Sequence, residues 1–214
     1  MVTRRALIGS LALVLLAGCG SSSGELPEGS ELLSQASVSM KAVSSAHFTV
    51  KVDGEVPNVP VKEAEGDLTS SGESSGRAKV EQFGQLVEVD FVLVGKDLWV
   101  KGPTGGFTKL SSALAGSVYD PTAILDPARG VAKVLGAANG AKTVSSDGGV
   151  SVVEATVPAE VAAGLVPGID ADVKARFSVR DEKLVNAVFT MPNGAKATVD
   201  LTDLNKLVTV TPPA

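Results

Sequence analysis

Hydrophobic and polar residues alternate along two long stretches of the chain. Between Gly76 and Lys101, apolar side chains recur at every second position, while Lys79, Glu81 and Glu88 occupy positions between them. The apolar set is Ala78, Val80, Val87, Val89, Phe91, Leu93, Leu98 and Val100. A similar alternation covers residues 173–201, interrupted by turn sequences at 181–183 and 192–195. A period of two with charges opposite the apolar side predicts antiparallel strands with one buried face.

Shorter segments extend this strand pattern. His47 to Asp53 alternates, with Phe48, Val50 and Val52 on one face. Residues 63–69 and 150–157 are each long enough for one further strand. The intervening stretch 54–60 contains two prolines, which indicates a turn-rich connection.

Helical spacing is confined to a few segments. Apolar residues at intervals of three and four predict a helix from about Glu31 to residue 44, with Ser30 as its N-cap. This stripe consists of Leu33, Ala36, Met40 and Val43.

Between the two strand blocks, Asp120-Pro121 and Asp126-Pro127 each place a capping acid before a proline, which predicts two helix starts. The first is a short turn through Ile124 and Leu125, and the second helix carries Val131, Val134 and Leu135 and ends within 136–140. Another short helix should run from Pro158 to Val166. Helices this short are stable only against other structure. We therefore expect an α+β fold, a single curved antiparallel sheet with helices across one face.

The N-terminus has the pattern of a targeting signal. Arg4 and Arg5 precede an apolar run that ends in Leu16-Ala17-Gly18-Cys19. An aliphatic residue, two small residues and a cysteine after a short apolar run are typical of a bacterial lipoprotein signal, and the run is short for a permanent membrane helix. An ordinary secretory signal and an N-terminal membrane anchor are the alternatives. We expect a signal peptide at 1–18, lipidation of Cys19, a flexible Gly/Ser tether at 19–29 and one domain at 30–214, held at the extracytoplasmic face of the cell membrane.

The composition limits which partners the domain can bind and which residues can form its core. The chain has 19 basic and 24 acidic residues, a net charge of −5, and loss of Arg4 and Arg5 would leave −7. An acidic domain does not suit a nucleic acid or a polybasic membrane contact. Cys19 is the sole cysteine, so no disulfide forms within one chain. Aromatic residues make up 4% of the chain, so Val, Leu and Ala must build the core.

No residue pattern indicates catalysis or a metal site. His47 is the only histidine and has no second ligand nearby in the pattern, so a structural or surface position suits it better than a zinc site or a triad. The glycine-rich stretch 102–106 lies between strands and opens no helix, which favours a hairpin loop over a phosphate site. Trp99 could stack on a sugar but fits half-buried sheet packing better. We expect no enzyme activity, no cofactor and no metal.

The order of several short motifs resembles the mycobacterial LprG/LppX family of cell-envelope lipoproteins, which also includes LprA and LprF. The matching stretches are 31–41, Ser45-Ala46-His47, Val52-Asp53-Gly54 with Pro57, Gly66-Asp67-Leu68-Thr69, Asp90-Phe91-Val92, Val118-Tyr119-Asp120-Pro121 through Leu125-Asp126-Pro127, Gly130-Val131-Ala132, Val134-Leu135 and 208–213. Each motif is weak alone, but together they span nearly the whole mature domain.

The resemblance implies a half-barrel sheet covered by helices with an apolar cavity between the layers. It also implies binding of acylated lipids or glycolipids, such as phosphatidylinositol mannosides, lipoarabinomannan, triacylglycerol or phthiocerol diesters, and their transport toward the outer envelope. Some members are linked to a membrane transporter, and we expect this chain to be a monomer. The predicted cavity residues are Val50, Val52, Ala78, Val80, Val87, Val89, Phe91, Leu93, Leu98 and Val100 from the sheet, and Ile124, Leu125, Val131, Val134 and Leu135 from the helices. Ala78 matches a central cavity position of the family.

Three functions remain open at this point. The first is a lipid carrier, which the aliphatic sheet and the resemblance favour. The second is a structural or adhesive envelope lipoprotein whose apolar alternation forms a closed core. The third is an enzyme that acts on envelope lipids or glycans. Bound lipid, an empty domain or turnover of added lipid would distinguish them.

Overall fold

The computed structural model describes residues 26–56, 59–110, 120–166 and 169–213. The elements in these ranges are α1 (Gly29–Lys41), β1 (Ser45–Asp53), β2 (Val61–Thr69), β3 (Ser74–Gln82), β4 (Gln85–Val94), β5 (Asp97–Lys101), β6 (Thr108–Lys109), η1 (Pro121–Ile124), α3 (Val131–Ala137), β7 (Asn139–Asp147), β8 (Val150–Val157), α4 (Ala159–Leu165), β9 (Val173–Arg180), β10 (Lys183–Thr190) and β11 (Lys196–Thr202).

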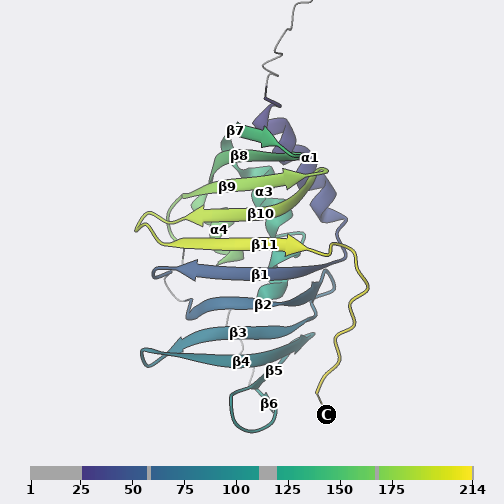
Figure 1. The fold of residues 1–214 in the computed structure, drawn as a ribbon, viewed down its shortest axis with the longest axis vertical. Helices are drawn as coiled ribbons and strands as arrows, with labels where there is room; N and C mark the ends of the chain where they lie inside the picture. The colour runs from purple at the N-terminus through teal and green to yellow at the C-terminus, as the bar shows by residue number, and fades with distance from the viewer. Residues whose placement is uncertain (1–25, 57–58, 111–119, 167–168, 214) are drawn as a thin grey trace, which may run out of the picture.

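All the strands belong to one open antiparallel sheet of 11 strands (Figure 1). Its order is β6-β5-β4-β3-β2-β1-β11-β10-β9-β8-β7, so two meanders meet at β1 and β11. In this central pair Phe48 lies opposite Leu201, and Val50 lies opposite Val199. Strands from the two ends of the domain therefore form the middle of the sheet.

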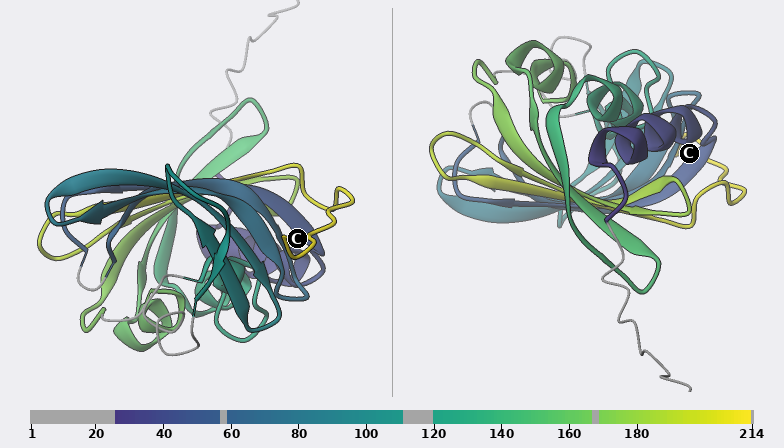
Figure 2. Two further views of the ribbon diagram at one scale, coloured as in Figure 1. Left: turned by 90° about the horizontal axis from the view of Figure 1, so that it is seen from below. Right: turned by 90° about the horizontal axis from the view of Figure 1, so that it is seen from above.

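The sheet has one apolar and one charged face. Val50, Ala64, Ala78 and Val89 are successive partners across β1 to β4, so these four side chains share a face. The opposite face carries ion pairs, including Lys79 with Glu63 at 2.7 Å and Arg176 with Glu154 at 2.6 Å. Figure 2 shows α1, α3 and α4 on one side of the curved sheet, which has the half-barrel form that the family resemblance implies.

A pair of glycines allows the sheet to bend between β2 and β3. Gly66 lies opposite Gly76. A Cβ on either residue would overlap backbone atoms of the other strand, namely the carbonyl oxygens of Ser75 and Glu65. The two backbones thus approach more closely than side chains would permit, which suits a strongly curved sheet.

The helices also contact one another closely. Ser37 of α1 is buried, and its hydroxyl donates a 2.7 Å hydrogen bond to the carbonyl of Ala132 in α3. A Cβ at Gly136 would come within 2.8 Å of the Ser37 hydroxyl oxygen. The absence of a side chain at Gly136 therefore lets α1 and α3 cross at short distance.

The capping predictions had mixed outcomes. The Asp120 side chain accepts a hydrogen bond from the backbone N–H of Thr122, which confirms that cap. Ser30 as an N-cap was wrong, because α1 begins two residues earlier than expected, at Gly29, and the Ser30 hydroxyl instead donates to the Glu28 carboxylate.

Asp126 as the cap of the following helix was also wrong. Its carboxylate accepts from Ala128 and Arg129 in an isolated turn, and α3 starts after Gly130. At Gly130 a Cβ would lie 2.5 Å from the carbonyl oxygens of Ala123 and Ile124, so only glycine fits where that turn meets the helix.

Strand β7 was not expected from the sequence. Most of its side chains are exposed, and it forms one edge of the sheet beside β8. Without a buried face it has no hydrophobic alternation. Its presence depends on pairing with β8, which a local pattern does not reveal.

Candidate functional site

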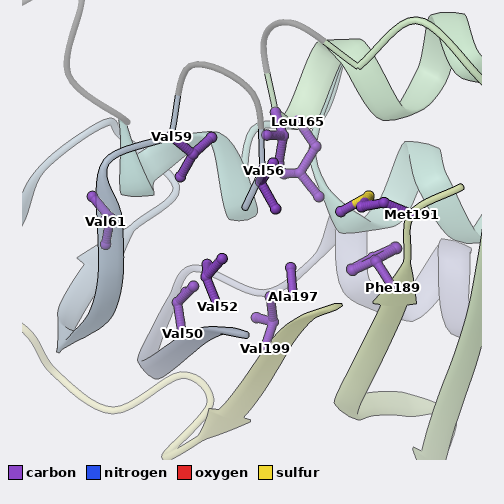
Figure 3. A pocket seen from close by; sticks show the side chains of 11 residues that line it. Val50, Val52, Val56, Val59, Val61, Leu165, Phe189, Met191, Ala197 and Val199 are labelled. Atoms are coloured by element: carbon purple, nitrogen blue, oxygen red, sulfur yellow. The ribbon is translucent and has the colours of Figure 1, made fainter. Parts of the chain in front are cut away.

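A pocket lies between the sheet and the helical layer, where β1 and β11 lie side by side (Figure 3). All its lining side chains are apolar: Val50, Val52, Val56, Val59, Val61, Leu165, Val166, Phe189, Met191, Ala197 and Val199. No lining residue carries a titratable group, so the pocket can accommodate a hydrocarbon group but not a charged one.

Strand register assembles the floor of this pocket. Val52 lies opposite Ala197, and Ala197 also lies opposite Phe189 of β10. Figure 3 shows Val56, Val59 and Leu165 facing this floor from the other side. Val56 and Val59 belong to the connection between β1 and β2, and Leu165 ends α4. We call these three residues the roof.

The pocket is small and partly open. Its volume amounts to about 30 Å³, whereas one water molecule needs about 10–15 Å³ of such space. The pocket as it stands therefore has room for only about two water molecules and not for an acyl chain. Any larger occupant requires the floor and the roof to separate.

The predicted cavity residues lie on the inner side of the sheet or in the helical layer. Val50 and Val52 line the pocket. Ala78, Phe91, Leu98, Ile124, Leu125, Val131, Val134 and Leu135 are buried in the core, and Val80, Val89, Leu93 and Val100 pack against it with partial exposure. Val87 is also partly buried, opposite Val80. A role in lining a lipid cavity stays a prediction for all of these residues.

Nine of the pocket residues were not predicted as cavity lining from the sequence. Phe189, Ala197 and Val199 belong to an alternating block, but nothing local indicates that β11 pairs with β1. Val56, Val59 and Met191 lie in connections without periodicity. These groups come together only because β1 pairs with β11 in the folded sheet.

His47 lies on the charged face, away from the pocket. Its Nδ1 is 2.9 Å from a carboxylate oxygen of Asp67, its neighbour on β2, and its side chain is 38% exposed. Within the described ranges, no three His, Cys, Asp or Glu side chains converge as a metal site would require. Cys19 lies outside the described residues.

An ion-pair cluster holds the turn before α3. The Arg129 guanidinium donates to Asp120 at 2.8 Å and to Asp126 at 3.1 Å. Partial burial by itself raises the pKa of the Asp126 carboxyl. The hydrogen bonds from Ala128 and Arg129 outweigh that effect and leave the pKa below its usual value. The cluster fixes the loop that carries Ile124 and Leu125.

No helix among the described residues is long and apolar enough to cross a membrane. Large apolar side chains are exposed at scattered positions among the described residues. The most exposed of these are Phe83 and Leu207.

Sequence comparison finds a family and close relatives. The model of the LppX_LprAFG lipoprotein family matches residues 28–210. The chain is 32% identical to the lipoarabinomannan carrier protein LprG of Mycolicibacterium hassiacum, over 95% of this chain and 94% of that protein. It is 33% identical to the protein of the same name from Mycolicibacterium smegmatis, over 95% and 92% of the two chains.

Solved structures share the fold. LprF from Mycobacterium bovis superposes with a TM-score of 0.76 at 24% identity, covering 88% of this chain and 98% of that one. The lipoprotein LppX from Mycobacterium tuberculosis gives a TM-score of 0.63 at 20% identity, covering 85% and 98%. At these identities the likeness supports the half-barrel architecture.

Proposed function

The chain belongs to the LppX_LprAFG lipoprotein family, and from that premise we propose that it binds acylated lipids or glycolipids and carries them toward the outer cell envelope. The acyl chains occupy the space between the sheet and the helices. Lipoarabinomannan-type glycolipids are the class that the names of its LprG relatives suggest.

The observation that carries this proposal is the purely apolar lining of the pocket between the two layers. Each CH₂ exposed to water costs about 0.8 kcal/mol, so one chain of about 16 carbons costs about 13 kcal/mol. A lipid therefore crosses water too slowly without shelter. A surface of Val, Leu, Ala, Phe and Met side chains provides that shelter without selecting for a polar group.

The pocket as it stands is the closed form of this site. With a volume of about 30 Å³, it excludes an acyl chain until the roof leaves the floor. Such movement would displace Val56 of the β1–β2 connection and Leu165 at the end of the seven-residue helix α4, which are both buried in this form. The separated layers would extend the cavity toward the predicted residues around Ala78.

The polar head group stays outside this apolar space. Two polar side chains hold the backbone of the connection just before the pocket residue Val56. Lys62 Nζ donates to the Gly54 carbonyl at 3.0 Å, and Asn193 donates to the Glu55 carbonyl at 2.9 Å. The Lys62 amine also lies 3.2 Å from a Glu81 carboxylate oxygen, so a head group would share it with Glu81, whereas the Asn193 amide would be released when the connection moves.

We further propose that lipidated Cys19 holds the domain at the extracytoplasmic face of the membrane. The tether 19–29 gives the domain short-range freedom. In this arrangement its partners are the carried lipid, the membrane and a membrane lipid exporter, and the chain acts as a monomer.

A substitution in the pocket floor tests the proposal. Ala197→Trp places a large ring among Val52, Phe189 and Val199, where lipid would lie. We expect the mature, membrane-extracted protein to stay folded and to lose co-purified lipid in native mass spectrometry. A substitution at Ala197 is a more direct test than one at Ala78, because Ala197 lines the pocket and Ala78 does not. The control is Thr198→Trp, one residue along β11 on the other face.

The alternatives give different results. In a closed structural core, Ala197→Trp overpacks the interior and lowers stability by about 1–3 kcal/mol, while the parent protein carries no lipid. Turnover of added lipid by the parent protein would favour an enzyme. Loss of lipid from both tryptophan variants equally would contradict the proposed site.

A further inference from the structure

The turn between β3 and β4 presents an aromatic side chain to solvent. Phe83 is 99% exposed, and Leu86, three residues later, is 64% exposed. Phe83 has φ of +53° and Gly84 has φ of +75°, the pattern of a two-residue hairpin turn with both central residues left-handed. Asn or Asp normally occupies the first of these positions, and a bulky side chain is disfavoured there. Phe83 thus adds backbone strain and exposed apolar surface, with no packing in return.

This turn lies at the same end of the sheet as the pocket. Val80, three residues before Phe83, lies opposite the pocket residue Val61. The Glu81 N–H also donates a 2.8 Å hydrogen bond to the Pro60 carbonyl, next to the roof residue Val59. In Figure 1 the β3–β4 turn projects from the side where the β1–β2 and β10–β11 connections also lie.

We propose that the Phe83 tip, defined as residues 82–86, inserts into the lipid bilayer to which the protein is anchored. Insertion brings the pocket end of the sheet against the membrane, so a lipid enters or leaves without crossing water. This inference rests on the proposed carrier function for its purpose, though the insertion itself can be tested separately.

The chemistry of the tip suits a bilayer. The residues beside Phe83 and Gly84 are the uncharged Gln82 and Gln85, which can enter the head-group region without the cost of burying a charge. A convex tip with one ring and one aliphatic chain fits a fluid surface. The acidic chain attracts no anionic lipid, so insertion depends on apolar burial and should vary little with salt.

The anchor leaves enough chain for this contact. The Thr143 hydroxyl donates to the Pro27 carbonyl at 2.6 Å, so the segment before α1 leaves the domain beside β7. The eight residues from Cys19 to Leu26 span up to about 28 Å when extended. The domain can therefore turn from its anchored edge until the Phe83 tip reaches the same membrane surface.

Tryptophan fluorescence in vesicles tests the insertion. In a Trp99→Phe background, Phe83→Trp gives one reporter in the mature lipidated protein. We expect blue-shifted emission in phosphatidylcholine vesicles and strong quenching by brominated acyl chains. The control is Leu207→Trp, which is 96% exposed in the parent protein but follows Lys206 at the opposite end of β1, where Ser45 binds the Lys206 carbonyl. This control should stay unquenched.

A second variant separates insertion from folding. Phe83→Asn creates an Asn-Gly pair, which this turn type prefers. The melting temperature of the variant should therefore be no lower than that of the parent. We expect lipid transfer between vesicles to slow about tenfold or more, because burial of one phenyl ring changes the affinity for the membrane by about that factor. If the parent protein transfers lipid and the variant transfers it equally fast, the proposal is overturned.

The other outcomes are equally decisive. Absence of quenching at position 83, or equal quenching at 83 and 207, would overturn insertion. A blue shift without vesicles that grows with protein concentration would identify a second copy as the occupant and also overturn it. Quenching in a protein that carries no lipid would leave insertion standing and reject the carrier function.

Discussion

Asp126 and Arg129 show how single side chains maintain the helical layer. The Asp126 carboxylate accepts the N–H groups of Ala128 and Arg129, and the Arg129 guanidinium joins it to Asp120. The loop they enclose places Ile124 and Leu125 in the core, at 0% and 7% exposure. At this scale, polar contacts at the edge position apolar residues in the interior.

Asp126→Asn should weaken this cluster in a pH-dependent way. The pKa of the Asp126 carboxyl is lowered in the folded chain, so its charge stabilises the fold above the unfolded value near 3.9, and that contribution is lost as pH falls through the lower folded value. At pH 7 we expect a loss of about 0.2–1 kcal/mol, because both side chains are partly exposed. Urea denaturation of parent and variant should show this gap narrowing below about pH 4. A constant gap would mean that the charge contributes nothing.

The sheet and helices depend on small residues at close approaches. Gly66 and Gly76 lie opposite each other between β2 and β3, and Gly136 lies against Ser37 between α3 and α1. At each site a side chain would meet a neighbouring element, and at the sheet pair it would meet backbone, which cannot turn aside. The curvature of the sheet therefore depends on the pair Gly66 and Gly76.

Gly66→Ala should be strongly destabilising. Its Cβ would overlap the Ser75 carbonyl, so the strands must move apart or flatten, and we expect a loss of about 2 kcal/mol or more in the free energy of unfolding. Gly102→Ala is the matched control, since a Cβ there meets nothing within 4 Å and its φ is not left-handed. Thermal melting of both variants checks this. Equal, small effects would show that the sheet can relax around Gly66.

At the scale of the whole domain, the described residues form a charged outer face and an apolar inner face. Ion pairs such as Glu63–Lys79 cover the outer face, and the pocket opens between the inner face and the helices. The start of α1 packs beside the edge strand β7, with Thr143 bound to Pro27. With the tether at 19–29 that we propose, such a domain would move relative to the membrane while its apolar interior stays covered.

Cys19→Ser tests the anchor at this scale. Without the thiol there is no acceptor for a diacylglyceryl group, so we expect unprocessed precursor or protein that does not partition into detergent. Labelled fatty acid and detergent partitioning of cell fractions provide the measurement. If the serine variant were labelled and partitioned as the parent does, the lipoprotein assignment would be wrong.

Local patterns in the sequence determined the faces of most strands, the apolar stripe of α1 and the cap at Asp120, because each depends on residues a few positions apart. They also placed Val50 and Val52 on the inner face. The pairing of β1 with β11, and with it the position of the pocket, was decided only by the tertiary structure. Val199 and Val50 are far apart in sequence, and their register follows from the closure of two meanders around one core. Strand β7 and the roof residues Val56 and Val59 depend likewise on neighbours that no local period reveals, since strand pairing and burial are properties of the assembled sheet.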